Sequence, residues 1–345
     1  MFLVVDCGTS YLKAALAEEN ALITKEVVRF ELSNPENPEN WVSALEKALS
    51  HFKNNNITCI ALTGQGPAAV AVTKDKKAPV AVLWNSKGQD PSNPSFLPRI
   101  KALKNNHPSV YSDAMYILGA AEYLAWILTG NACTAAPVEG FEKFYALDDS
   151  IDLSLIPPFM KSGSFLGKYK DASVLVPWPD FVPAIIGSGA VHPGMLCLRT
   201  GTGDGINLCT SEPIHREGFL TARHPNGKDW NLSCIVSGTG TAVAQNKSIE
   251  QAFSKSADAI KRLSDLPLKE IRIAGGLSDN DELNSIRANL TGMKMSSTKS
   301  KETGLQGLAI LAYCALNGAD IKKTTDSVVS VKKTYFPLDA GLILE

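Results

Sequence analysis

The chain has 345 residues and a formal net charge of −1, with 44% hydrophobic and 20% charged residues. This balance is typical of a soluble globular protein, and the length favours two medium-sized domains over one large domain. Lysine and arginine are scattered without a dense basic block, which argues against nucleic acid and a membrane surface as partners. No stretch approaches the roughly 20 apolar residues that cross a bilayer, and the 7 cysteines include no CxxC pair. We therefore expect a cytoplasmic protein with reduced thiols that binds a small molecule or another protein.

The first residues pass from an apolar run through Asp6 into the turn Gly8-Thr9-Ser10. A glycine permits close approach of a ligand to the backbone, and successive N–H groups in a tight turn can hold an anion. The hydroxyls of Thr9 and Ser10 add donors, and Asp6 suits Mg²⁺, which prefers oxygen ligands. The alternative is an ordinary hairpin turn with Asp6 as its polar edge.

Apolar patterns divide the first half into strands and helices. A three-stranded antiparallel meander is predicted to open the chain, and a helix is predicted to begin at Pro38 and to end before Asn54. Further strands place Gln65 and Trp84 in loops at strand ends, where binding residues are common. A second helix is predicted to begin at Leu118 and to stop at Gly130. The short apolar runs predicted to be strands are residues 2–7, 11–17, 21–30, 57–63, 68–73 and 80–84.

The composition of residues 153–183, rich in proline and glycine, indicates a domain boundary. We place it at 168/169, giving domains of residues 1–168 and 169–345. The second domain opens like the first, because an apolar strand leads into Gly201-Thr202-Gly203-Asp204 and a return strand follows. This suggests a second phosphate turn. Asp204 is then either a carboxylate near a metal or a turn residue, and Asp before Gly suits a turn.

Two more glycine turns follow. Residues 237–241, Ser-Gly-Thr-Gly-Thr, precede an amphipathic helix, and the sequence leaves open whether this turn is more than structural. Gly275-Gly276 follows a strand and precedes a helix that Asn280 introduces. A strand, a glycine pair and a helix N-terminus together suit a nucleotide-binding corner.

Taken in order, these motifs resemble those of the FGGY carbohydrate kinases, which are members of the actin-like ATPase superfamily. Each motif is weak alone, and their common order along nearly the whole chain carries the resemblance; the sugar-side loops are nearest to xylulokinase-type members. The motifs are Asp6-Cys7-Gly8-Thr9-Ser10 with Lys13, Gly64-Gln65-Gly66, Leu83-Trp84-Asn85, Leu128-Thr129-Gly130, Asp180 before Gly187-Ser188-Gly189-Ala190, Gly201-Thr202-Gly203, Gly275-Gly276 with Asn280, and Glu302-Thr303-Gly304-Leu305-Gln306-Gly307.

The resemblance implies an α/β fold of two actin-like (ribonuclease H-like) domains with a cleft between them. It also implies ATP-dependent phosphorylation of a sugar or polyol hydroxyl, with Asp180 as general base and Asp6 supporting Mg²⁺. A homodimer is among the assemblies that the sequence allows. The residues implied to bind ATP are Gly8, Thr9, Ser10, Lys13, Gly201, Thr202, Gly203, Gly275, Gly276 and Asn280; those implied to bind the sugar are Gln65, Trp84, Asn85 and Asp180.

Two of these assignments have structural alternatives. Asp180 precedes a predicted helix and could serve as its N-cap, and both roles are compatible. Trp84 offers an apolar face to sugar C–H groups, but it could equally be a core residue at the end of a strand.

The sugar side departs from the family pattern. Family members commonly have Trp-Asn-Asp-x-Arg, whereas this chain has Trp84-Asn85-Ser86-Lys87-Gly88 and lacks both the acid and the arginine. The segment between Gly203 and Gly275 is also shorter than usual. Three hypotheses remain: an active sugar or polyol kinase, a catalytically inactive nucleotide-binding relative with a regulatory role, and an actin-like phosphotransferase that acts on another alcohol.

Overall fold

The computed structural model of the protein describes residues 1–18, 20–245 and 248–338. The chain forms two compact units, which are Met1–Pro183 with Leu308–Ala319 (unit 1) and Ala184–Gly307 with Asp320–Glu345 (unit 2). Each unit is built on its own seven-stranded sheet. The domain boundary that we placed at 168/169 lies inside strand β10, because the proline- and glycine-rich stretch forms short strands that join the sheet of unit 1.

The sheet of unit 1 mixes antiparallel and parallel strands in the order β10-β11-β4-β1-β2-β3, with β12 also paired to β4. The antiparallel β1-β2-β3 meander confirms the one predicted from the sequence, and β4 runs parallel to β1. The strands are β1 (Phe2–Cys7), β2 (Tyr11–Ala17), β3 (Ile23–Glu31), β4 (Cys59–Gly64), β10 (Phe165–Tyr169), β11 (Ala172–Leu175) and β12 (Trp178–Pro179).

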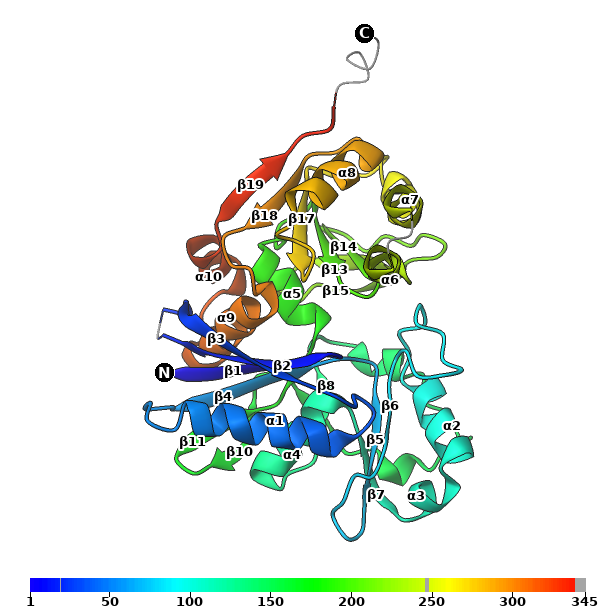
Figure 1. Cartoon of the computed structure of the whole chain (residues 1–345), viewed down its shortest axis with the longest axis vertical. Coiled ribbons are helices and arrows are strands. Elements are labelled where there is room, and N and C mark those ends of the chain that lie inside the picture. Colours follow the sequence, from blue (N-terminus) through cyan, green and yellow to red (C-terminus); the bar gives the residue numbers. More distant parts are fainter. Residues whose placement is uncertain (19, 246–247, 339–345) are drawn as a thin grey trace. The chain divides into compact units, whose positions relative to one another are not determined.

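Helices α1 (Pro38–His51) and α4 (Ala120–Thr129) pack against this sheet, as Figure 1 shows. Helix α1 begins at the predicted proline, since Pro38 follows the N-cap Asn37 and tolerates a first-turn position. Its apolar stripe, which includes the fully buried Trp41, contributes to the same core as Leu3 and Val5 of β1. Helix α4 ends at Thr129, before Gly130, as predicted.

The part of the unit 1 chain that follows β4 forms a smaller three-stranded sheet and two helices. The sequence did not predict the two helices, and residue 118, which we assigned to a helix, belongs to a strand. These elements are β5 (Ala69–Thr73), β6 (Ala81–Val82), α2 (Leu97–Asn106), α3 (Pro108–Ser112) and β7 (Ala114–Leu118), followed by β8 (Thr134–Ala136), 3₁₀ turns η1 (Phe141–Tyr145) and η2 (Leu153–Leu155), and β9 (Phe159–Lys161).

The sheet of unit 2 has the order β15-β16-β14-β13-β17-β18-β19. Helices α7 and α8 lie side by side over one face, and their apolar residues share a core with β13, β14 and β17. The strands are β13 (Met195–Thr200), β14 (Asp204–Thr210), β15 (Leu220–Arg223), β16 (Trp230–Val236), β17 (Glu270–Gly275), β18 (Met295–Thr298) and β19 (Val331–Tyr335), and the helices are α6 (Thr239–Ala244), α7 (Ile249–Lys261), α8 (Asp281–Thr291) and α10 (Ile321–Val328). Helices α5 (Phe181–Ser188) and α9 (Thr303–Asn317) each have residues in both units.

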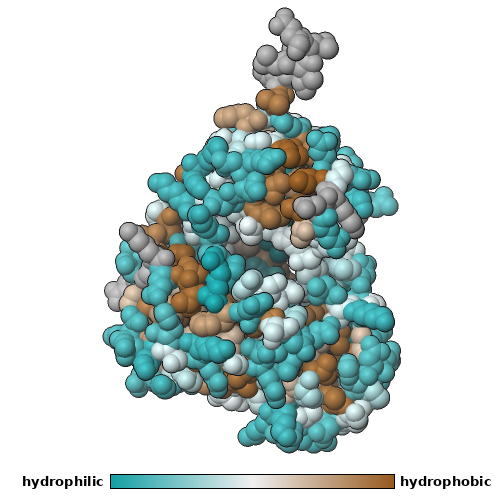
Figure 2. Space-filling model, viewed as in Figure 1, coloured by the Kyte–Doolittle hydropathy of each residue, from teal (hydrophilic) through white to brown (hydrophobic). Residues whose placement is uncertain are grey.

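On the face shown in Figure 2, hydrophobic residues form separate groups within a mostly hydrophilic surface. Across residues 1–18, 20–245 and 248–338, no helix combines the length and the apolar character that a membrane crossing requires.

Candidate active site

The register of three parallel strands brings several candidate residues to one edge of the unit 1 sheet. Cys7 of β1 pairs with Gly64 of β4, and Gly64 pairs with Pro179 of β12. The residues that come next in each strand are Gly8, Gln65 and Asp180. Three candidates that are far apart in the sequence therefore meet at the carboxyl ends of neighbouring strands, where α/β proteins usually bind ligands.

The first phosphate turn is linked to the sugar-side loops by a chain of hydrogen bonds. The indole Nε1 of Trp84 donates to Oγ1 of Thr9 (3.4 Å), and this hydroxyl donates to Oε1 of Gln65 (3.0 Å). The structure thus joins three side chains that we predicted separately, one from a phosphate motif and two from the sugar side. The hydroxyl of Thr9 is committed to its neighbours in this arrangement.

The same turn is also a hairpin turn, which was our alternative interpretation. The N–H of Gly8 donates to the carbonyl of Tyr11 (3.0 Å), which closes the β1–β2 connection. The backbone of Gly8 is therefore used in closing the turn. An incoming phosphate would have to be met by the N–H groups that follow it and by Ser10, whose side chain is exposed.

Gln65 carries a buried donor without a partner. The side chain is 4% exposed, and its Nε2 has no hydrogen-bond partner although its Oε1 accepts from Thr9. Leaving a buried donor unpaired costs about 1–3 kcal/mol. A buried, oriented and unpaired amide at a strand end is suited to a ligand oxygen.

Trp84 takes part in both arrangements that the sequence left open. Its ring is partly buried against the core of unit 1, while its indole N–H reaches Thr9. The turn that carries it is closed by Ser86, whose Oγ accepts from the N–H of Leu83 (2.8 Å) and donates to Oε1 of Glu36 (2.6 Å). Asn85 is exposed beside Trp84.

Three charged residues form a row across the meander. Asp6 of β1 lies opposite Lys13 of β2, and Lys13 lies opposite Arg29 of β3, so their side chains share one face of the sheet. Among the residues that the structure describes, no group of three or more His, Cys, Asp or Glu side chains could hold a metal ion. Mg²⁺ in phosphotransferases is usually held by one or two carboxylates and the substrate phosphates. A single half-buried carboxylate such as Asp6 fits that pattern.

Asp180 immediately precedes helix α5 and is partly buried. The preceding strand β12 is fastened to β4, because Oγ1 of Thr63 donates to the carbonyl of Trp178 (2.7 Å). The position of Asp180 relative to Gln65 is therefore set by the sheet itself.

In unit 2, the second phosphate turn and the glycine pair lie at the ends of adjacent parallel strands. Thr200 of β13 pairs with Gly275 of β17, and Oγ1 of Thr200 donates to the carbonyl of Ala274 (2.8 Å). Gly275 has φ +93°, and a Cβ on it would lie 2.1 Å from the carbonyl oxygen of Thr200. Only glycine suits that backbone and that spacing.

A third turn, which the sequence left without a role, lies against the second one. The N–H of Gly240, in α6, donates to the carbonyl of Thr202 (3.1 Å), and a Cβ on Gly240 would lie 1.7 Å from the carbonyl of Gly201. The sequence contained the signal, since Gly238-Thr239-Gly240 repeats the Gly-Thr-Gly of residues 201–203. The contact could not be foreseen because it joins the ends of two strands that are not consecutive.

Asn280 caps helix α8, and its Oδ1 accepts from the N–H of Leu283 (3.0 Å). Gly276 is exposed, and a Cβ built on it would meet nothing within 4 Å. The adenosine-side motif is thus an open loop ahead of a well-capped helix.

Asp204 lies in a strand, so our interpretation of it as a turn residue was wrong. It is the first residue of β14, it is fully buried, and its Oδ2 accepts from Oγ of Ser256 (2.8 Å) while Nη2 of Arg287 lies 3.5 Å from Oδ1. Burial raises the pKa of Asp204, and the guanidinium of Arg287 acts in the opposite direction. The local dipeptide Asp-Gly suggested a turn, but the pairing of β14 with β13 and β16 overrides it.

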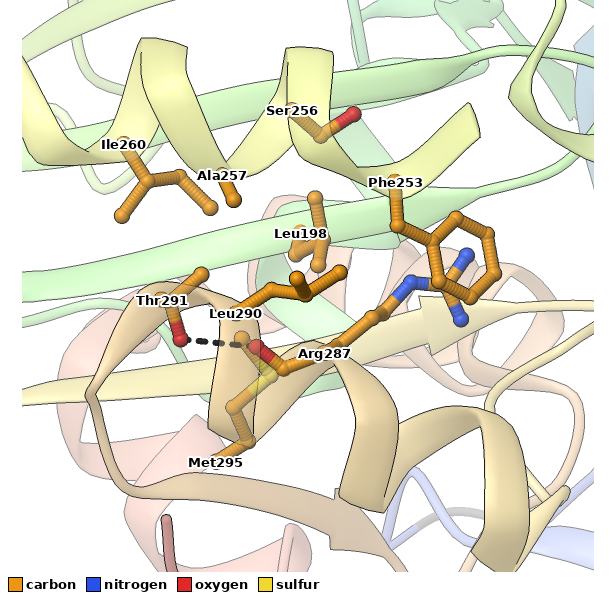
Figure 3. A pocket seen from close by; sticks show the side chains of 9 residues that line it. All are labelled: Leu198, Phe253, Ser256, Ala257, Ile260, Arg287, Leu290, Thr291 and Met295. Atoms are coloured by element: carbon orange, nitrogen blue, oxygen red, sulfur yellow. Dashed lines mark hydrogen bonds between the residues drawn. The ribbon is translucent and has the colours of Figure 1, made fainter. Parts of the chain in front are cut away.

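Figure 3 shows the side chain of Arg287, from α8, beside Phe253 of α7. The guanidinium of Arg287 lies over the ring of Phe253, 3.8 Å from its centroid. The adjoining cavity has a volume of about 10 Å³, which is close to the space of one water molecule. This cavity is a packing feature, and it is too small for a nucleotide.

Comparison with known proteins agrees with the motif order. The C-terminal domain of the FGGY family of carbohydrate kinases matches residues 237–316. The xylulose kinase of Lactococcus lactis subsp. lactis (strain IL1403) is 29% identical over 274 residues, which cover 63% of this chain and 54% of that protein. This chain is therefore similar to FGGY carbohydrate kinases over the matched parts of its length. The alignment spans just over half the length of that curated relative.

Solved structures of xylulose and glycerol kinases share the fold of this chain. A ligand-bound xylulose kinase from Lactobacillus acidophilus has a TM-score of 0.74 at 14% identity, covering 98% of this chain and 94% of that one. The Plasmodium falciparum glycerol kinase, solved with ADP, has a TM-score of 0.75 at 15% identity, again covering 98% and 94%. The likeness confirms the expected α/β fold class with two sheet-based domains.

Proposed function

We propose that the chain uses ATP to phosphorylate a hydroxyl group of a sugar or polyol. The observation that carries this proposal is the unpaired, buried Nε2 of Gln65, which lies at the same sheet edge as Asp180 and the first phosphate turn. An ordered donor for a hydroxyl oxygen beside a carboxylate is the arrangement that an acceptor alcohol needs. The name of the Lactococcus relative makes xylulose the first acceptor to try.

In this proposal the residues of unit 1 bind and orient the acceptor. Gln65 donates to one substrate oxygen, Trp84 covers an apolar face of the sugar, and Asn85 contacts it from the loop. Asp180 accepts the proton of the attacked hydroxyl as the oxygen approaches phosphorus. Phosphoryl transfer demands mainly alignment and stabilisation of charge, so rigid placement by the sheet is the chief contribution of these residues.

We further propose that Gly8, Thr9, Ser10, Gly201, Thr202 and Gly203 of the Gly-Thr turns bind ATP, together with Gly275, Gly276 and Asn280. The glycine-only spacings of the unit 2 turns support this, because they bring the backbone of three glycine turns together at one edge of the unit 2 sheet. Mg²⁺, when bound, neutralises charge on the phosphates, and Asp6 and Lys13 are the residues of the first motif that would face it and the phosphates.

The test is ADP release with MgATP across ketoses, aldoses, polyols and sugar acids, comparing wild type with Asp180→Asn. Loss of a general base lowers kcat by about 100-fold or more, while the isosteric amide preserves the fold. One stimulating acceptor together with that loss is the expected result. Stimulated turnover that survives Asp180→Asn contradicts the assignment of the base.

The lost acid and arginine at Ser86 and Gly88 favour a second candidate, a nucleotide-binding relative without kinase activity and with a regulatory role. It predicts that calorimetry finds MgATP binding although no acceptor in the panel raises ADP release.

A further inference from the structure

Arg99, in α2, is fully buried, and its guanidinium donates hydrogen bonds to backbone carbonyls. Nη1 donates to the carbonyl of Ser95 (3.1 Å), and Nη2 donates to those of Trp84 (3.1 Å) and Asp90 (2.8 Å). Burial lowers the pKa of Arg99, and the nearby carboxylate of Asp90 opposes this. A guanidinium nevertheless stays protonated near neutral pH, because its ordinary pKa exceeds 12.

The three carbonyls all belong to the loop that connects β6 to α2 and carries Trp84. Apart from the side-chain hydrogen bonds of Trp84 to Thr9 and of Ser86 to Glu36, the other hydrogen bonds of this loop are short-range turns, such as those that Asp90 makes with Ser92. Arg99 is therefore the group that ties the start, the middle and the end of the loop to one helix. A planar guanidinium presents five N–H donors in a fixed geometry, which a lysine ammonium cannot reproduce.

From Trp84 the connection continues to the unpaired donor. The indole of Trp84 donates to Thr9, Thr9 donates to Oε1 of Gln65, and the amide of Gln65 is thereby oriented with its Nε2 unpaired. Each link comes from a different loop, so the orientation of the amide depends on where the Trp84 loop is held. Arg99 holds that loop at the carbonyl of Trp84 itself.

We propose that Arg99 is a positioning residue for the acceptor site, which it sets through Trp84 and Thr9 without touching the substrate. This inference rests on the proposed kinase function. It also explains how a sugar-side loop without the family's acid and arginine keeps a defined shape: Ser86 closes the local turn, and the arginine of the next helix fixes the rest.

The experiment compares Arg99→Lys with wild type, with Arg287→Lys in unit 2 as the matched control. Both variants place a lysine at a fully buried arginine, so both lose some stability. Arg99→Lys should raise the KM for xylulose, or for the best acceptor in the panel, roughly tenfold, as expected when charge-assisted hydrogen bonds are lost. The KM for ATP should stay unchanged. Arg287→Lys should leave the acceptor KM unchanged.

Hydrogen–deuterium exchange of residues 84–95 gives a readout that needs no activity. We expect faster exchange of these amides in Arg99→Lys and wild-type rates in Arg287→Lys. Unchanged exchange in Arg99→Lys overturns the inference, and so does faster exchange with an unchanged acceptor KM, because the role would then be structural only. A wild-type protein without any acceptor-dependent turnover contradicts the kinase function instead, while the exchange result still decides whether Arg99 anchors the loop.

Discussion

Two buried arginines, one in each unit, are satisfied in different ways. Arg99 in unit 1 donates to three neutral carbonyls of a single loop, whereas Arg287 in unit 2 lies 3.5 Å from one carboxylate and stacks on Phe253. The Nε, Nη1 and Nη2 atoms of Arg287 make no hydrogen bond with good geometry. Arg99 thus relies on hydrogen bonds to backbone, and Arg287 relies on a charge pair with Asp204.

The difference follows from what each arginine must fix. A loop has carbonyls that no helix or sheet hydrogen bond satisfies, so the N–H donors of a guanidinium stabilise the loop directly. Helices satisfy their own carbonyls, so a buried arginine between them needs a counter-charge, and Asp204 at the end of the second phosphate turn supplies it. A buried pair of this kind adds little net stability, but breaking it is costly.

The largest expected change in the free energy of unfolding therefore comes from replacing Arg287. Arg287→Met leaves the buried carboxylate of Asp204 without its counter-charge, and the free energy of unfolding should fall by about 3–5 kcal/mol. Arg99→Met leaves only neutral carbonyls in a loop and should cost about 1–3 kcal/mol. Urea denaturation of both variants measures the difference.

The double variant Asp204→Asn/Arg287→Met is the control for that prediction. It removes the unpaired charge, so it should recover much of the stability that Arg287→Met loses. Equal losses for the two arginine variants, or no recovery in the double variant, would show that charge pairing is not what distinguishes the two arginines.

Acidification should weaken unit 2 through His224. This side chain is 1% exposed, its Nδ1 accepts from the N–H of Asn226, and burial lowers its pKa from the ordinary 6.5 to about 4, with Asp229 and Lys322 nearby. Between these two pH values, His224 is mostly protonated in the unfolded chain and mostly neutral in the folded chain. Stability should therefore fall as the pH drops from 6.5 towards 4, by up to ~3 kcal/mol.

The matched variant for the pH prediction is His224→Asn, which keeps an acceptor for Asn226 and removes the titration. Its urea midpoint should depend less on pH than that of wild type over this window. Two buried carboxyls with raised pKa values, Glu122 in unit 1 and Asp204 in unit 2, take up protons more readily when folded and so act in the opposite direction. An identical pH dependence in wild type and variant would exclude His224 as the cause.

The smallest expected effects come from two glycine variants in the turns of unit 2. Their comparison distinguishes close packing of the backbone from contact with a ligand. Gly240→Ala places a Cβ 1.7 Å from the carbonyl of Gly201, so it should cost about 1–3 kcal/mol and raise the KM for ATP by shifting the second phosphate turn. Gly276→Ala meets nothing within 4 Å and should change stability by less than about 0.5 kcal/mol.

Any rise in the KM for ATP of Gly276→Ala then reports contact with the nucleotide itself. The acceptor KM should not change in either glycine variant, the reverse of the pattern expected for Arg99→Lys. If both glycine variants destabilise the protein equally, the close approach of the third turn to the second is not a constraint.

Predictions from local sequence signals were correct for elements whose bounds depend on short-range interactions. The meander, the helix that begins at Pro38 and the end of α4 before Gly130 follow from apolar spacing and capping alone. The prediction of a domain boundary at 168/169 did not foresee the β10–β11 hairpin, because proline and glycine in short sheet strands resemble a linker. The helices α2 and α3 were missed for a similar reason, since each has a proline in its first turn and follows a loop-like composition.

The sequence by itself determined which groups are available for chemistry: the glycine turns and the carboxylates Asp6 and Asp180, in an order that resembles the FGGY carbohydrate kinases. Only the tertiary structure decided which of them meet. The parallel register of β1, β4 and β12 places Gln65 beside Asp180, and three hydrogen bonds from Arg99 set the loop of Trp84. These contacts join residues far apart in the chain, and their geometry depends on strand register and burial, which no local pattern encodes.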